Sequence, residues 1–161
     1  MQRALMREVS LRDGLHMVKG DLPAKRTLAW IADPVGYAVP GQVEREFSEF
    51  GRRLPATRIS AHFHDTRGGG GANIASSRQP GITRCDASIG GLGGYSYAPG
   101  ATGNSNAENV IFLLELKRYS TGIDIDRLRA LRRKVERRLP GERFFGAIAR
   151  ADLPNHASSL Q

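Results

Sequence analysis

The chain has 161 residues, of which 40% are hydrophobic and 25% charged, and its net charge is +8. This length suffices for one domain with a buried core, and no apolar run approaches the ~20 residues that span a membrane. The N-terminus alternates charged and apolar residues rather than forming a signal peptide, and the single cysteine excludes an internal disulfide, so we expect a cytoplasmic protein. The positive charge favours polyanionic partners, either nucleic acid or a phosphate-bearing cofactor.

The sequence pattern of the first fifth of the chain predicts a short strand and then a helix. Residues 4–10 (ALMREVS) form the strand, which ends at the turn Arg12-Asp13-Gly14. Pro23 suits the first turn of a helix, and Lys25 to Ile31 continue it. The segment ADPVGY that follows breaks the helical pattern abruptly.

The rest of the chain alternates helices with strands. Helices are predicted over 42–53, 106–116 and 125–139, and strands over 58–63 and 82–89. Val43, Phe47 and Phe50 share one face of the first of these helices. The four glycines at 68–71 are flexible and poor for starting a helix, and a glycine-rich loop spans 90–103. This alternation favours an α/β fold with parallel strands, as one domain over 1–161.

Two histidines could form half of a metal site. His62 and His64 are two residues apart in a predicted strand, so their side chains point to one face. Asp13 follows the first strand, and Asn104 closes the glycine-rich loop, at the strand ends where α/β barrels place their chemistry. Two imidazoles, a carboxylate and an amide oxygen suit octahedral Mg²⁺ or Mn²⁺ better than Zn²⁺. The alternative is a pair of structural strand histidines bonded to water or backbone.

Five segments resemble, in order, motifs of the hydroxymethylglutaryl-CoA lyase family. They are EVSLRDGL (8–15), IADPVGYAVP (31–40), ISAHFHDTRG (59–68), DASIGGLGGYSYAPGATGN (86–104) and TGIDIDRL (121–128). The resemblance implies a (β/α)₈ TIM barrel, which needs about 250 residues. The family's first strand and helix, over 1–31, are followed directly by the C-terminal part of the barrel, over 32–161. We therefore expect a partial barrel whose central strands are missing.

The resemblance implies a metal-dependent retro-Claisen cleavage of 3-hydroxy-3-methylglutaryl-CoA, or a related acyl-CoA, to acetyl-CoA and a keto acid. Arg12 would stabilise the developing negative charge. Asp33 matches an acidic position near the site, although it could equally be a turn residue before Pro34. Tyr95 stands where the family has a cysteine that handles the product's proton. A phenol is the weaker acid, with a pKa of about 10 against about 8.5 for a thiol.

Three functional hypotheses stay open. The chain is an acyl-CoA lyase, with its barrel completed by a second copy in a homo-oligomer, or it is an internally deleted relative that binds metal without turnover. The third hypothesis is a basic polyanion-binding module, because arginines crowd 125–139. Arginines spread around a helix more often form a solvated surface, and no nucleic-acid-binding motif is present, so nucleic acid is the disfavoured partner.

Overall fold

The computed structural model describes residues 2–3, 5–8, 29–53, 59–78, 80–94 and 102–151. The main sheet formed by these residues has four parallel strands: β2 (Leu5–Glu8), β3 (Ala29–Asp33), β4 (Ile59–Phe63) and β5 (Arg84–Ala87). The short strands β1 (Gln2–Arg3) and β6 (Tyr119–Ser120) pair with each other in parallel. The helices are α1 (Pro40–Arg53), α2 (Gly70–Ser77), α3 (Ala107–Leu116) and α4 (Ile125–Arg138). The predicted α/β class is confirmed.

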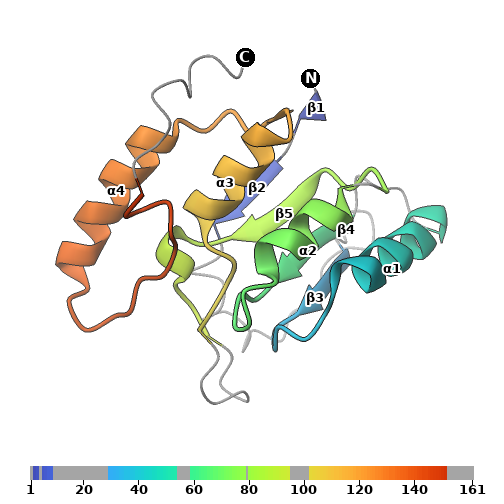
Figure 1. Cartoon of the computed structure of the whole chain (residues 1–161), viewed down its shortest axis with the longest axis horizontal. Helices are drawn as coiled ribbons and strands as arrows, with labels where there is room; N and C mark the ends of the chain where they lie inside the picture. The colour runs from blue at the N-terminus through green and yellow to red at the C-terminus, as the bar shows by residue number, and fades with distance from the viewer. Residues whose placement is uncertain are drawn as a thin grey trace, which may run out of the picture.

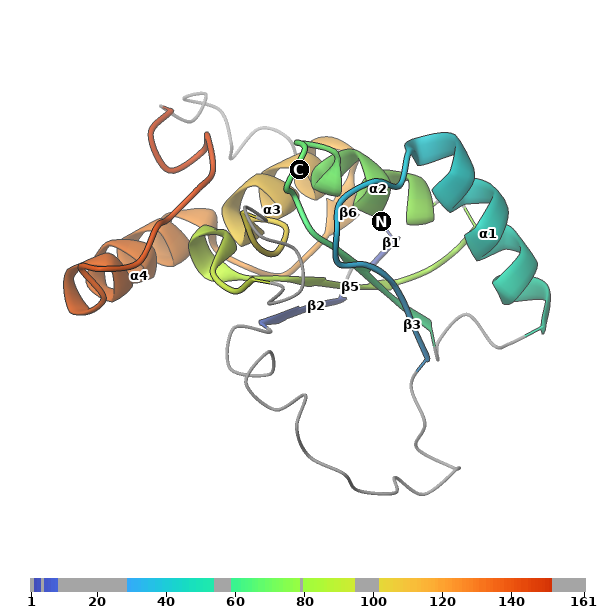
Figure 2. The ribbon, with the colours of Figure 1, turned by 90° about the horizontal axis from the view of Figure 1, so that it is seen from below.

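The strand order of the main sheet is β2-β5-β4-β3. The first of these strands in the sequence therefore lies beside the last, with Met6 opposite Cys85, while β4 lies between β5 and β3. Because all four strands are parallel, their carboxyl ends lie at one edge of the sheet. Helices α1, α2 and α3 lie on one face of this sheet, and α4 lies farther out beside α3 (Figures 1 and 2).

The core lies between β4 and the helices. All five residues of β4 are buried, as expected for a strand with neighbours on both sides. Ile59, Ala61 and Phe63 belong to the apolar core, and the Phe63 ring centroid lies 6.0 Å from that of Phe47 on α1. Because side chains alternate along a strand, Ser60 and His62 point to the opposite face. The core thus fixes the direction of the histidine side chain.

The predicted helix over 23–31 is wrong at its C-terminal end. Residues 29–31 belong to β3, in which Ala29 pairs with Ile59 and Ile31 with Ala61. Pairing with the buried strand β4 outweighs local helical periodicity there. The start of that predicted helix lies outside the described residues.

The glycine run at 68–71 does start a helix, contrary to expectation. Helix α2 begins at Gly70, whose backbone N–H donates to Asp65 Oδ1 at 2.8 Å. A Cβ atom at Gly70 would overlap Ser105 Oγ and lie 3.0 Å from Asp65 Oδ1. Close packing therefore requires glycine here, and the aspartate supplies an acceptor for an N–H group that the first helical turn leaves unsatisfied.

The other predicted elements agree with the structure to within a few residues. Strand β5 is shorter than predicted, because the chain turns at Ile89–Gly91. On α1, Val43 and Phe47 are buried, whereas Phe50 is 41% exposed. Among the helices of the described segments, none combines the length and the apolar character needed to cross a membrane.

Candidate metal centre

The two histidines lie side by side at the carboxyl end of β4. His62 is 5% exposed and His64 is 3% exposed. Their ring centroids are 5.3 Å apart and their planes meet at 65°. The structure therefore brings both imidazoles together, as the two-residue spacing predicts.

Asn104 joins this pair although it lies forty positions later in the sequence. His64 and Asn104 form an isolated antiparallel bridge, flanked by hydrogen bonds from Asp65 N to Gly103 O and from Ser105 N to Phe63 O, both 3.0 Å long. The Asn104 side-chain nitrogen donates to Leu92 O at 2.8 Å, which directs the amide oxygen away from Leu92. An amide oxygen is the donor that Mg²⁺ or Mn²⁺ takes from asparagine.

Asp86 is a buried carboxylate at this site that the sequence analysis did not single out. Its Oδ2 atom lies 3.5 Å from His62 Nδ1, and its Oδ1 atom accepts a hydrogen bond of 3.1 Å from Ser60 Oγ. A carboxylate beside Nδ1 favours the tautomer with a proton on Nδ1, which leaves the Nε2 lone pair available to a metal. His62 and Asp86 are register partners in adjacent parallel strands, so aligning the two strand ends would have found the pair.

Asp33 lies near the histidines and closes a turn. Its Oδ1 atom accepts from the backbone N–H groups of Val35 and Gly36, at 3.1 and 2.8 Å, and its Oδ2 atom accepts from Ala38 N at 2.6 Å. Its backbone oxygen accepts from His64 N at 3.0 Å. The carboxylate therefore has the turn role that the sequence offered as an alternative, and its catalytic role stays a prediction.

Three predicted site residues, Arg12, Asp13 and Tyr95, lie outside the described residues, and their roles stay predictions. Within the described segments, no three His, Cys, Asp or Glu side chains are grouped so that they could hold a metal ion. The donors that the structure does bring together are two imidazoles and one amide. This mixed set fits a divalent ion with several oxygen ligands, provided that further oxygens come from elsewhere.

The family model named HMGL-like matches residues 24–135. Hydroxymethylglutaryl-CoA lyase YngG of Bacillus subtilis is 39% identical over 109 residues, which are 68% of this chain and 36% of that protein. A 3-hydroxy-3-isohexenylglutaryl-CoA/hydroxymethylglutaryl-CoA lyase of Pseudomonas aeruginosa is 37% identical over 117 residues, 64% of this chain and 39% of that protein.

A solved HMG-CoA lyase from Acinetobacter baumannii, in complex with coenzyme A and 3-methylmalate, superposes with a TM-score of 0.73 at 35% identity. The superposition covers 79% of this chain and 41% of that one. The chain thus spans about two fifths of the length of its relatives, and its parallel strands and helices form part of a TIM barrel. On these matches, the chain belongs to the HMGL-like family.

Proposed function

We propose that this chain binds a divalent metal, Mg²⁺ or Mn²⁺ ahead of Zn²⁺, through His62, His64, Asn104 and Asp13. The observation that supports the proposal best is the meeting of His62, His64 and Asn104 at one strand edge, from segments forty residues apart. Asp86 beside His62 Nδ1 is the kind of partner that orients metal-binding imidazoles.

We further propose that the bound metal serves the cleavage of 3-hydroxy-3-methylglutaryl-CoA, or a related acyl-CoA, to acetyl-CoA and a keto acid. The metal supplies Lewis-acid polarisation of the substrate's hydroxyl group, which eases its deprotonation. Arg12 stabilises the negative charge that develops as the carbon–carbon bond breaks. Tyr95 stands where a thiol would handle the product's proton, and a phenol is the weaker acid for this task. Slow turnover is the expected consequence.

The main alternative is a shortened relative that retains metal binding and has lost turnover. It is supported by the coverage of the matches, since about three fifths of the length of each relative lies outside the part that matches this chain. Completion of the barrel by a second copy belongs to the active hypothesis, whereas a cytoplasmic location is proposed under either hypothesis. Light scattering on a size-exclusion column distinguishes a monomer from such a homo-oligomer.

A polyanion-binding function is the third candidate, and α4 gives it little support. Arg127 and Arg129 pair with acidic neighbours on the same helix, at 3.3 Å from Asp124 and 3.5 Å from Asp126. Pairs of this kind reduce the positive charge that α4 offers to a polyanion. Steeply salt-dependent binding to duplex DNA would revive this candidate.

The deciding experiment combines metal binding with an assay of acetyl-CoA formation. The purified chain is titrated with Mn²⁺, followed by electron paramagnetic resonance, and is then incubated with the acyl-CoA. His62→Ala and His64→Ala should each weaken Mn²⁺ binding, whereas His156→Ala serves as the control for nonspecific histidine binding. Metal binding with acetyl-CoA formation supports the lyase, metal binding alone supports the shortened relative, and absence of both contradicts the proposal.

A further inference from the structure

Helix α4 has one buried arginine among many exposed ones. Arg132 is 4% exposed and is the only buried residue of α4. Its Nη1 atom lies 3.6 Å from Glu108 Oε1 on α3, and Glu108 is fully buried. Burying two charges is costly unless each is paired and hydrogen bonded. The pair is therefore a specific contact between α3 and α4 rather than part of a solvated surface.

The two charged side chains hold two backbone segments together. We call residues 88–92 the glycine turn and residues 141–146 the strap. The Gly90 N–H group donates to Glu108 Oε2 at 3.1 Å, and Arg132 Nη1 donates to Phe145 O at 2.6 Å. Phe145 N also donates to Gly90 O at 2.7 Å, so these contacts form a closed set, which we call the circuit. Each charged group thus fixes one segment, and the segments are bonded to each other.

The glycines in this circuit allow the segments to approach closely. Gly90 has a φ of 63°, a conformation that side chains disfavour, and a Cβ atom there would overlap the Phe144 ring. A Cβ atom at Gly146 would overlap the Asn106 side chain, which donates to Phe145 O at 2.8 Å. The strap is thereby pressed against the glycine turn and against the start of α3.

The same turn holds the proposed metal ligand Asn104. Leu92, the last residue of the turn, accepts the hydrogen bond from the Asn104 amide nitrogen. Ser88, its first residue, exchanges backbone hydrogen bonds with Ser105 and Ala107, at 3.0 and 2.8 Å. The position of the turn therefore determines where the Asn104 amide oxygen points.

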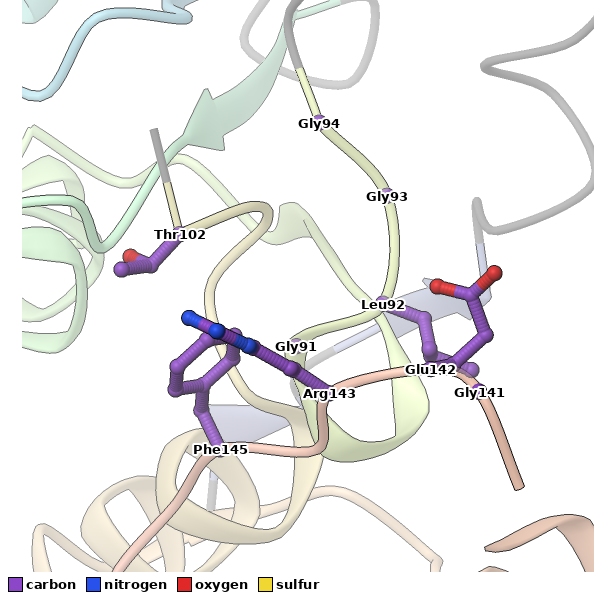
Figure 3. Close-up of a pocket in the computed structure, with 9 residues that line it drawn as sticks. All are labelled: Gly91, Leu92, Gly93, Gly94, Thr102, Gly141, Glu142, Arg143 and Phe145. Atoms are coloured by element: carbon purple, nitrogen blue, oxygen red, sulfur yellow. The ribbon is translucent and has the colours of Figure 1, made fainter. Parts of the chain in front are cut away.

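Among the residues that the structure describes, the other side of the turn borders a hollow rather than the core. A hollow of about 420 Å³ lies between Gly91–Gly94, Thr102 and the strap. In Figure 3 the Arg143 side chain extends from the strap toward Thr102, whereas Glu142 points to the opposite side. The turn is therefore held by hydrogen bonds rather than by core packing among the described residues: those to Glu108 and to the strap, and those of Ser88 and Leu92.

We propose that Glu108 and Arg132 are positioning residues, which fix the glycine turn and, through it, the orientation of Asn104 toward the metal. The role in metal binding rests on the proposed function above. The effect on the turn does not, because it concerns only this chain's own contacts. The two parts can therefore be tested separately.

The first test measures the turn by hydrogen exchange with mass spectrometry. Arg132→Met should raise early exchange in 88–94 and 102–106 while leaving β4 and α1 unchanged. Arg133→Met, an exposed neighbour on the same helix, should change neither segment. Unchanged exchange in both segments, or a uniform rise over the whole chain, would overturn the proposal. If Arg132→Met does not fold, the double variant E108Q/R132M removes both charges and leaves none buried unpaired.

The second test measures Mn²⁺ affinity in a double-mutant cycle. Arg132→Met should weaken Mn²⁺ binding about ten-fold, a magnitude typical of groups that orient metal ligands. In an Asn104→Ala background the same change should have almost no further effect, because the Glu108–Arg132 pair acts through Asn104. Full additivity of the two losses would overturn the positioning role. A wild-type chain that binds no Mn²⁺ would refute the proposed function, while the exchange data would still decide whether Glu108 and Arg132 fix the glycine turn.

Discussion

The Nδ1 atom of His62 lies 3.5 Å from Oδ2 of Asp86, and both side chains are almost completely buried. The two residues face each other across adjacent parallel strands. A buried carboxylate this close to Nδ1 favours a proton on that nitrogen, which leaves Nε2 available to a metal.

Asp86→Asn should weaken Mn²⁺ affinity by about ten-fold to a hundred-fold, because an amide can donate to Nδ1 and stabilise the wrong tautomer. Calorimetric titration measures this affinity. Asp126→Asn, an exposed change on α4, is the matched control for lost negative charge. Equal affinities of Asp86→Asn and the wild-type chain would mean that Asp86 does not orient His62.

Asp33→Ala should lower the free energy of unfolding by about 1–3 kcal/mol, because three backbone N–H groups lose their acceptor. Mn²⁺ affinity should stay close to that of the wild-type chain. Denaturant unfolding and metal titration on the same sample check both. Unchanged stability together with lost acetyl-CoA formation would instead support the catalytic role that the family resemblance implies for Asp33.

Gly70→Ala and Gly71→Ala should have opposite effects on stability. A Cβ atom at Gly70 meets Ser105 and Asp65, so overpacking should cost about 1–3 kcal/mol. At Gly71 the nearest contact is an ordinary 3.7 Å to Leu113, so alanine should stabilise the helix by about 0.5 kcal/mol. Thermal unfolding of the two variants measures the difference. Equal melting temperatures would show that the glycine run is not fixed by its neighbours.

Tyr95→Cys should increase the rate of acetyl-CoA formation, since a thiol is a stronger acid than a phenol. The assay compares initial rates at saturating Mn²⁺, with Tyr95→Phe as the control that removes the acid without supplying a thiol. If Tyr95→Cys and the wild-type chain form acetyl-CoA at the same rate, the missing thiol is not what limits turnover.

The histidine strand was predictable from the sequence because its signals are local. A buried apolar strand with two histidines at a spacing of two places both imidazoles on one face whatever surrounds it. The helices α1, α3 and α4 likewise follow from periodicity and from their first residues. The segment 29–31 was misassigned, because its pairing with β4 is a contact between distant parts of the sequence that no local pattern reveals.

Asp86 and Arg132 were missed for the same physical reason. Asp86 becomes significant only when β5 lies beside β4, and Arg132 resembles its exposed neighbours until α4 packs on α3. The flexibility of the glycine run predicts no helix start, because the Asp65 and Ser105 side chains that surround Gly70 come close to it only in the folded chain. Tertiary contacts, rather than residue type, separate these residues from similar ones in the sequence.

The central claim is that His62, His64 and Asn104 bind one divalent ion, and a Mn²⁺ titration tests it most directly. Wild-type chain and the variants His62→Ala, His64→Ala and Asn104→Ala are compared by electron paramagnetic resonance at equal protein concentration. The account predicts one tightly bound Mn²⁺ per chain, or per copy in an oligomer, and a marked loss of affinity in each variant. Equal affinity of all four proteins, or no specific binding by the wild-type chain, would contradict it.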